Sequence, residues 1–289
     1  MGRNIETSSY WLMAGVSTTG VSHEKAGVEC QDAWACSQSV EPTGSVVMAA
    51  ACVSDGAGSV CKAFTGAKLT AWAVSVWLLE HFPSALEMPR DWIRQSCLSM
   101  VRRSIRRAAK RAGYPPDEYA ATFVAVCAGS DGKWLALHLG DGGIIGRFGN
   151  EILVVSQPEK GEFANESWFA TSSDALEHIR VYGSSFDRGL SDPTGFVLFS
   201  DGVEDSLLDR RKGTVAKAAS VMLDWFRDHS PDKVSTALEE NLGTIFCERS
   251  HDDCTIVLMA KPNERPEPGK NPPEGGVQSI PVHAGLSED

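Results

Sequence analysis

The sequence lacks several features that would place it in common classes of protein. None of its apolar runs reaches the ~18–20 residues that a helix needs to cross a bilayer. Its first residues, 1–6, contain no apolar core of a secretory signal. An excess of positive charge is also missing, because 38 acidic residues outnumber 27 basic ones and the net charge is −11. Nucleic acids and anionic membranes favour basic surfaces, so we expect a cytoplasmic protein that binds neither.

Cysteine pairs with the spacing of a zinc site are absent as well. The eight cysteines include no Cys-x-x-Cys pair. Several of them lie inside apolar runs, such as 51–53 and 126–128. This pattern is typical of buried free thiols in a reducing compartment, where disulfides are rare. No internal repeat occurs, except that two strand-like runs both end in Ser-Asp-Gly.

The chain does contain enough apolar residues to form a sizeable core. Its 289 residues are 42% hydrophobic and 22% charged, which is ordinary for a globular protein. Residues 261–289 differ, because they are rich in Pro, Gly and Glu and have too few apolar side chains to offset the entropy of ordering. We therefore expect one folded domain over residues 1–260 and a disordered tail over 261–289.

Hydrophobic periodicity predicts strands and helices in groups and not in strict alternation. The four strands between 121 and 155 are joined by short glycine turns, which predicts an antiparallel meander. Residues 18–32 indicate a polar loop, and 157–193 an irregular stretch. This grouping excludes a doubly wound parallel sheet and favours an α+β fold, an antiparallel β-sandwich with helix pairs on both outer faces (α-β-β-α). The predicted strands are 10–17, 46–54, 121–128, 133–139, 143–148, 151–155, 195–200 and 254–260, and the predicted helices are 60–82, 91–111, 213–228 and 231–246.

Five aspartates lie at the ends of apolar runs. Two of them have nearly the same surroundings, because Asp55 and Asp201 each follow a serine at the end of a strand-like run and precede a glycine. Hard divalent cations such as Mg²⁺ and Mn²⁺ prefer carboxylate oxygens held on rigid elements. The five candidate metal ligands are Asp32, Asp55, Asp141, Asp201 and Asp252.

Each aspartate also has an ordinary structural explanation. Asp-Gly after a strand is a common turn, which applies to Asp55 and to Asp201. The surroundings of Asp141 are equally typical of a hairpin turn, and those of Asp252 are typical of a solvated turn. Asp32 is placed to cap a backbone amide. No single motif decides between a metal ligand and a turn.

Taken in order, these motifs resemble those of the metal-dependent protein phosphatases of type 2C. They look most like the motifs of a bacterial branch of that family. The resemblance implies hydrolysis of phosphoserine and phosphothreonine by a metal-bridging water or hydroxide, without a covalent intermediate. The absence of a Cys-x₅-Arg phosphate loop agrees with this. We expect a monomer that acts on phosphorylated proteins and opposes a serine/threonine kinase. The matching segments are 20–23, 30–33, 54–58, 121–123, 140–142, 199–203 and 252–255.

The resemblance also implies a role for each aspartate in binding two Mn²⁺ or Mg²⁺ ions, with a third possible. Asp55 would bridge the two ions, and the carbonyl group of Gly56 would assist it. Asp201 and Asp252 would complete the shell of one ion. Asp32 would hold the other ion or its waters.

Two further residues receive a role from the resemblance. Asp141 matches an aspartate that helps to bind the third, weaker ion in bacterial members. His23 is the candidate catalytic proton donor beside Asp55, although a lone loop histidine is often structural.

The chain departs from the family pattern in three places. Gln31 stands where many relatives have glutamate, which removes one carboxylate from the second ion. Ala57 stands where relatives often have His or Met, and no arginine that could grip the phosphate lies near 18–19. These departures motivate an alternative, a catalytically weak or inactive phosphoprotein-binding regulatory module. A metal-dependent hydrolase of another phosphoester would share the same site chemistry.

One face of the predicted helix 91–111 is rich in arginine. Such a face is typical either of a solvated helix surface or of a nucleic-acid-binding surface. The acidic total charge and the lack of interleaved aromatic residues favour the solvated surface. The face comprises Arg94, Arg102, Arg103, Arg106, Arg107, Lys110 and Arg111.

Overall fold

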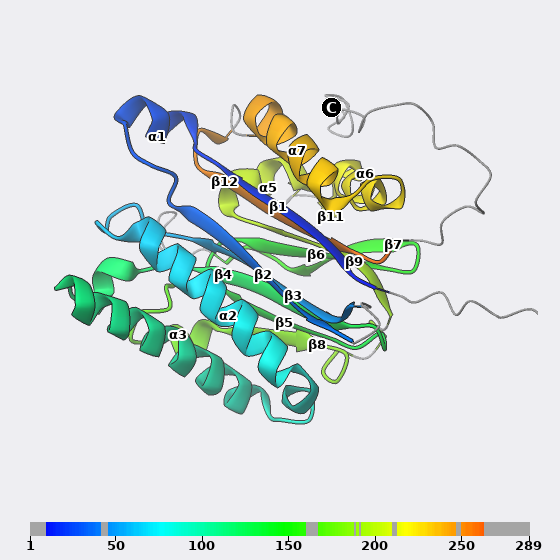
Figure 1. Cartoon of the computed structure of the whole chain (residues 1–289), viewed down its shortest axis with the longest axis horizontal. Coiled ribbons are helices and arrows are strands. Elements are labelled where there is room, and N and C mark those ends of the chain that lie inside the picture. The colour runs from blue at the N-terminus through cyan, green and yellow to red at the C-terminus, as the bar shows by residue number, and fades with distance from the viewer. Residues whose placement is uncertain are drawn as a thin grey trace, which may run out of the picture.

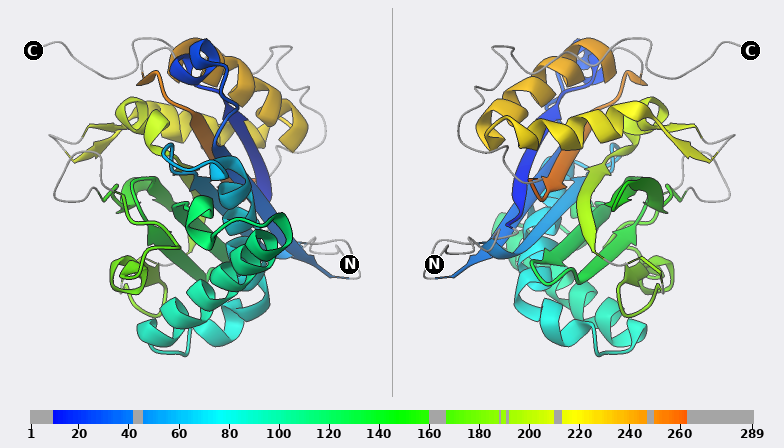
Figure 2. Two further views of the ribbon diagram at one scale, coloured as in Figure 1. Left: turned by 90° about the vertical axis from the view of Figure 1, so that its left-hand side faces the viewer. Right: turned by 90° about the vertical axis from the view of Figure 1, so that its right-hand side faces the viewer.

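Two five-stranded antiparallel sheets lie face to face, with helices covering both outer faces (Figures 1 and 2). The structure is a computed structural model that describes residues 10–41, 46–159, 167–187, 189–190, 192–209, 213–246 and 250–262. This arrangement confirms the predicted α+β sandwich. The boundary at 260 and the disordered tail stay predictions, because residues 263–289 lie outside the described part.

The first sheet has the strand order β1-β12-β9-β6-β7. Its helical layer consists of α5 (Asp201–Leu207), α6 (Lys217–Asp224) and α7 (Pro231–Asn241), followed by short helical turns at Trp225–Arg227 and Leu242–Phe246. A small hairpin of β10 (Leu208–Asp209) and β11 (Thr214–Val215) follows α5. The strands are β1 (Leu12–Thr18), β6 (Gly143–Phe148), β7 (Glu151–Ser156), β9 (Pro193–Phe199) and β12 (Cys254–Ala260).

The second sheet has the order β2-β3-β4-β5-β8. It is covered by two long helices, α2 (Ala63–Ala85) and α3 (Arg90–Ala112). Three short helices lie in the connections, namely α1 (Val21–Ala26), η1 (Pro116–Tyr119) and α4 (Ala175–His178). The strands are β2 (Asp32–Val40), β3 (Val46–Asp55), β4 (Phe123–Gly129), β5 (Trp134–Leu139) and β8 (Arg180–Gly183).

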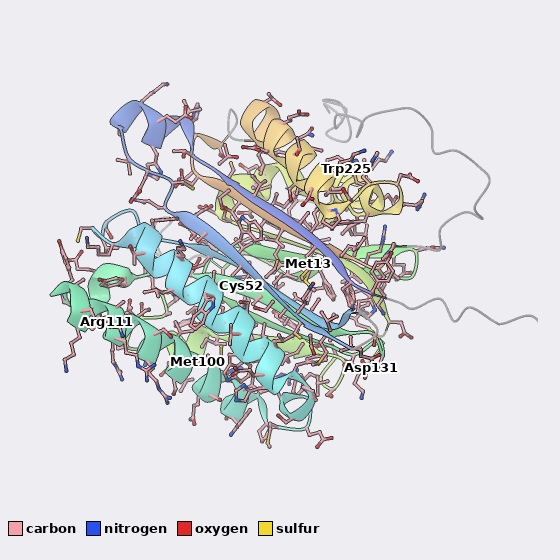
Figure 3. The ribbon with its side chains drawn as sticks, viewed as in Figure 1. Met13, Cys52, Met100, Arg111, Asp131 and Trp225 are labelled. Atoms are coloured by element: carbon pink, nitrogen blue, oxygen red, sulfur yellow. The ribbon has the colours of Figure 1, made fainter. Side chains whose placement is uncertain are left out.

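The interior strand β3 shows why the inner strands are apolar on both faces. Successive side chains of a strand point to opposite sides. Ala51 and Val53 pack into the layer between the sheets, whereas Ala50 and Cys52 pack toward the helices, and Cys52 lies beneath α2 (Figure 3). A strand covered on both faces is a continuous apolar run, which is the signal that predicted it.

The sequence prediction missed most of the short elements, among them α1, α5, β2 and β8. The predicted loop over residues 18–32 contains the helix α1 and ends at the first residue of β2. β2 was missed because it is an edge strand. Its second half is mostly polar and partly exposed, so it lacks the apolar run of a buried strand. β8 has only four residues and is held by antiparallel pairing with β5, so residues 157–193 are less irregular than predicted.

The predicted meander is wrong, because its four strands belong to two different sheets. β4 pairs with β5 in the second sheet, whereas β6 pairs with β7 and β9 in the first. The chain therefore crosses from one sheet to the other at Gly140–Gly142. Asp141 lies in this crossover and not in a hairpin turn.

The described residues carry neither a candidate membrane span nor a disulfide. Their helices include none that is both long and apolar enough to cross a membrane. Every cysteine in this part of the chain is a free thiol, and four are buried as predicted, whereas Cys61 is exposed and Cys30 and Cys36 are half-buried. Cys247 lies outside the described residues.

Candidate metal centre

Asp32 and Asp55 lie directly opposite each other at the end of the second sheet. They form the last residue pair in the antiparallel register of β2 and β3. Asp32 is buried, with 2% of its surface exposed, and Asp55 is half-buried. Like charges directly opposite in a sheet destabilise it. Each carboxyl also shifts the pKa of the other, and a proton or a hard cation between the two would relieve their repulsion.

Thr122 fixes the main chain around Asp55. The Asp55 amide donates to the Thr122 hydroxyl at 3.2 Å, and the Thr122 amide donates to the Asp55 carbonyl at 2.8 Å. The Ser54 hydroxyl donates to the Thr122 carbonyl at 2.6 Å. The motif 121–123 therefore positions Asp55, a role that its sequence alone did not reveal.

Ser200 joins the two sheets at this end of the sandwich. Its hydroxyl donates to Asp32 Oδ2 at 2.7 Å and accepts from the Thr255 amide at 2.9 Å. The Ser200 amide donates to the Thr255 carbonyl at 3.0 Å. Asp201, the next residue, begins α5 and is half-buried. Sequence analysis did not single out Ser200, although the repeated Ser-Asp-Gly was the available signal.

Four of the five predicted aspartates interact electrostatically. Burial raises the pKa of Asp32 to about 7, against hydrogen bonds from Ser200 and Asp55 that lower it. The pKa of Asp55 is raised well above its ordinary value, first by burial and then by the charges of Asp32, Asp201 and Asp141. The described residues nevertheless contain no group of three His, Cys, Asp or Glu side chains drawn together as a finished metal site.

Asp141 supplies an observation that fits a cation. The Ser167 hydroxyl donates to its Oδ2 atom. Its Oδ1 atom is buried and has no hydrogen-bond partner among the described residues. A buried anionic oxygen without a donor is costly, and carboxylate oxygens are the preferred ligands of Mg²⁺, Mn²⁺ and Ca²⁺. The residues present therefore suit a hard divalent ion.

Asp252 and Asp253 differ sharply although they are adjacent. Asp252 is exposed, and its Oδ1 atom accepts only from the Asp253 amide, at 2.8 Å, among the described contacts. Asp253 is buried, and its two oxygens accept from the amides of Gly20 at 2.7 Å and Gln31 at 2.6 Å. Asp252 is not among the charges that most raise the pKa of Asp55, and its role as a metal ligand stays a prediction. Asp253 is a structural residue that sequence reasoning missed.

The start of β12, which carries these two aspartates, is enclosed by two glycines. A Cβ atom on Gly20 would lie 2.2 Å from the carbonyl carbon of Asp252. A Cβ atom on Gly202 would lie 2.0 Å from the carbonyl oxygen of Asp253. Main chain therefore packs directly on main chain here, and only glycine permits this approach.

The two-sheet fold and the aspartates around Asp55 can now be compared with known protein families. Residues 19–243 match the family description "Protein phosphatase 2C". The chain belongs to this family. Serine/threonine-protein phosphatase 3 of Escherichia coli (strain K12) is 28% identical over 181 residues, which cover 61% of this chain and 68% of that protein. The prediction that the chain is a protein phosphatase enzyme is confirmed.

Solved structures share the fold of this chain. A bacterial serine phosphatase has a TM-score of 0.56 at 12% identity, covering 88% of this phosphatase and 98% of that chain. The serine/threonine phosphatase Stp1 from Staphylococcus aureus has a TM-score of 0.55 at 13% identity, covering 91% and 100%. At these identities the likeness shows the fold alone.

His23 lies on α1 of the phosphatase and faces Asp253. Its Nδ1 atom is 2.9 Å from Asp253 Oδ2, within ion-pair distance, and 24% of its side chain is exposed. This contact favours the structural alternative for His23. Its role as a proton donor stays a prediction.

Gln31 and Gly56 are joined through the main chain. The Gly56 amide donates to the Gln31 carbonyl at 3.2 Å, and Gly56 forms an isolated β-bridge with Ala121. The adjacent Ala57 amide donates to the Ala120 carbonyl at 3.0 Å. The segment after Asp55 is thus held on both sides, while the roles of the Gly56 carbonyl and of the Gln31 side chain in metal binding stay predictions.

His138 holds the crossover that carries Asp141. This fully buried residue of β5 lies 2.8 Å from the Gly140 carbonyl through Nε2 and 2.7 Å from the Ser156 hydroxyl through Nδ1. Burial, and then the charge of Arg180, lower the pKa of His138 to about 3. The neutral ring can therefore donate to Gly140 and accept from Ser156 at the same time.

Proposed function

We propose that this phosphatase removes phosphate from phosphoserine and phosphothreonine in proteins and depends on Mn²⁺ or Mg²⁺. The observation that carries the proposal is the pairing of Asp32 with Asp55 at the end of the second sheet, where the charges of Asp201 and Asp141 also raise the pKa of Asp55. Carboxylates repel a phosphate dianion. A phosphatase site lined by them therefore needs cations to receive its substrate.

The proposed ligands follow the order of the sequence motifs. Asp55 would hold both ions with help from the Gly56 carbonyl, Asp201 and Asp252 would serve one of them, and Asp32 would serve the other. Bound in pairs, such ions polarise phosphoryl oxygens and lower the pKa of water to near neutrality. Asp141 belongs to a third and weaker site, which its unsatisfied Oδ1 atom supports.

Neighbouring residues hold the aspartates of the site in place, and none of those described next to Asp32 is suited to attack phosphorus. Thr122 immobilises Asp55, and Ser200 orients Asp32 by donating to its Oδ2 atom. The cysteine nearest in sequence to Asp32 is an unsuitable nucleophile, because burial and the charges of Asp32 and Asp253 raise the pKa of Cys30 far above its ordinary value. A thiol attacks only as thiolate. This supports direct transfer of the phosphoryl group to water, in which the new P–O bond forms as the bond to the serine or threonine oxygen breaks.

Phosphatase assays on a phosphothreonine peptide and on p-nitrophenyl phosphate test the proposal. We expect turnover with Mn²⁺, loss of turnover with a chelator, and loss of turnover in Asp55→Asn. The matched control is Asp205→Asn, which removes the same charge from an exposed position on α5 and should retain activity. Turnover that survives both chelation and Asp55→Asn would falsify the metal mechanism.

Calorimetry with Mn²⁺ separates the enzyme from the regulatory module. Binding that Asp55→Asn abolishes supports the enzyme, whereas no binding at millimolar Mn²⁺ would favour a phosphoprotein-binding module. We further propose a monomeric, cytoplasmic protein that opposes a serine/threonine kinase, which rests on the sequence analysis.

A further inference from the structure

The outer face of α3 carries a strongly basic groove with about 520 Å³ of open space. We name it the α3 basic groove. Arg111 marks the end of α3 beyond it, and Met100 marks the middle of the helix (Figure 3). The groove is lined by Ser99, Arg102, Arg103, Arg106, Arg107 and Lys110.

The positive charges of the α3 basic groove are not compensated by its own helix. α3 contains no acidic residue after Asp91, which pairs with Arg94 at 3.1 Å. Within the described part of the chain, Arg103, Arg106 and Arg107 form no ion pair, and all three are exposed. Residues three or four apart on a helix are neighbours, and like charges at this spacing repel each other. An anion from outside the helix would relieve this repulsion.

The charge and the lining of the α3 basic groove favour an acidic polypeptide as the anion that binds there. The whole chain carries a net charge of −11, so the groove reverses the sign of the surface locally. Guanidinium groups bind carboxylates and phosphates through paired hydrogen bonds. Single-stranded nucleic acid would also need aromatic side chains for base stacking, and the lining contains none. Carboxylate and phosphorylated side chains of a protein meet all the requirements of the groove.

The inner wall of the groove is bonded to the residues around the metal centre. Arg102 donates to the carbonyls of Ala170 at 2.9 Å and Ser172 at 2.5 Å. The Ala170 amide in turn donates to the Ala121 carbonyl at 2.9 Å, and Ala121 bridges Gly56, the residue after Asp55. A polypeptide lying in the groove is therefore separated from the Asp55 strand end by a single hydrogen-bonded loop.

We propose that the α3 basic groove docks an acidic segment of the phosphoprotein substrate, at a distance along the chain from the phosphorylated residue. The proposal rests on the proposed function, because it assigns a second contact to the same substrate. It makes the enzyme selective for substrates with an acidic flank, without any change in the chemistry at Asp55.

The test measures how fast the full-length, Mn²⁺-loaded protein hydrolyses each of two phosphothreonine peptides. One has a flank of alternating Asp and Glu, and the other has the matching Asn and Gln. The groove variant is the double substitution Arg103→Glu/Arg107→Glu, which leaves Arg102 and its loop contacts intact. The matched control is Lys217→Glu/Lys233→Glu, which makes the same change of charge at exposed positions on α6 and α7.

For the wild type we expect a kcat/KM about tenfold higher on the acidic peptide than on the neutral one, with the preference weakening as salt is added. The groove variant should lose this preference and still hydrolyse the neutral peptide and p-nitrophenyl phosphate at the wild-type rate. The control should keep the preference. Equal rates on both peptides in the wild type, or equal losses on both in the groove variant, would overturn the docking site.

Binding measurements keep the test independent of turnover. Fluorescence anisotropy with the unphosphorylated acidic peptide should show salt-sensitive binding that the groove variant loses, even if the proposed catalysis fails. Stronger competition by a single-stranded RNA than by the acidic peptide would overturn the assignment to a protein substrate. Self-association of the wild type that the groove variant abolishes would overturn it in favour of a second copy of the chain.

Discussion

Two sets of buried polar groups lie at the same end of the sandwich and are treated in opposite ways by the fold. Asp253 and His138 have hydrogen-bond partners on both of their polar atoms. Asp55 instead faces Asp32, and Asp141 keeps one oxygen without a described partner. The first set has its partners within the chain, whereas the second presents carboxylate oxygens that suit a hard cation.

The difference separates residues that support the site from residues that bind. A carboxylate that accepts from amide donors is stabilised as an anion within the chain and gains less from binding a metal. A carboxylate among other carboxylates is strained until a cation arrives. Adjacent acids such as Asp252 and Asp253 can therefore have different functions, because the hydrogen bonds of Asp253 mark it as a supporting residue.

The largest expected effect is that of Asp55→Asn. Removing the bridging ligand should lower kcat by roughly 10³-fold, equivalent to about 4 kcal/mol of transition-state stabilisation. The metal-free variant should be at least as stable as the wild type, because one of the repelling charges is gone. Steady-state kinetics and thermal unfolding in chelator measure the two effects. A marked loss of stability would place Asp55 among the supporting residues.

Alanine substitutions at Asp252 and Asp253 come next in size and should give opposite results. Asp253→Ala leaves the buried amides of Gly20 and Gln31 without an acceptor and should lower the free energy of unfolding by about 3 kcal/mol. Asp252→Ala should change it by less than about 0.5 kcal/mol and should weaken Mn²⁺ binding instead. Denaturant titration in chelator and calorimetry separate these outcomes. Similar stability losses in both variants would break the comparison.

The pH dependence of His138 gives a smaller effect. Because the pKa of this histidine falls from 6.5 to about 3 on folding, its contribution to stability is complete above the unfolded value and is lost as pH falls. Between about pH 7 and about pH 5 the wild type should lose about 2 kcal/mol more than His138→Asn. Denaturant unfolding of the two proteins across this range provides the measurement. Parallel pH profiles would contradict the assignment.

The smallest effect is expected for His23→Gln. If His23 only neutralises Asp253, the substitution should cost less than about 1 kcal/mol of stability and should change kcat by less than about threefold. A fall in kcat of about 10²-fold or more, together with an altered pH–rate profile, would instead confirm the predicted proton donor.

The sequence predicted the inner parts of the fold better than its edges. β3 and β12 are covered on both faces, so their unbroken apolar runs were clear signals. β2 and β8 were missed because one has polar residues on its outer half and the other is only four residues long. The division of the meander between the sheets was not predictable from local pattern, since the turn at Gly140–Gly142 looks like any other glycine turn.

The candidate site also has parts that local sequence predicts and parts that it does not. Asp55 and Asp201 were predictable because each follows a buried strand and precedes a glycine. The supporting contacts were not, because Ser200 meets Asp32 across 168 positions of sequence and Gln31 meets Asp253 across 222. Such pairs depend on how the two sheets dock, which no local motif encodes.

The glycines at positions 20 and 202 set a limit on how this centre can be redesigned. Since they hold the start of β12 by contact of main chain with main chain, the spacing there has no side chain through which it can be adjusted. A saturation library should tolerate almost no substitution at either glycine, and grafting the two aspartates onto another scaffold will require both. Variation that alters the specificity of the enzyme is therefore available mainly at its periphery, where side chains face solvent.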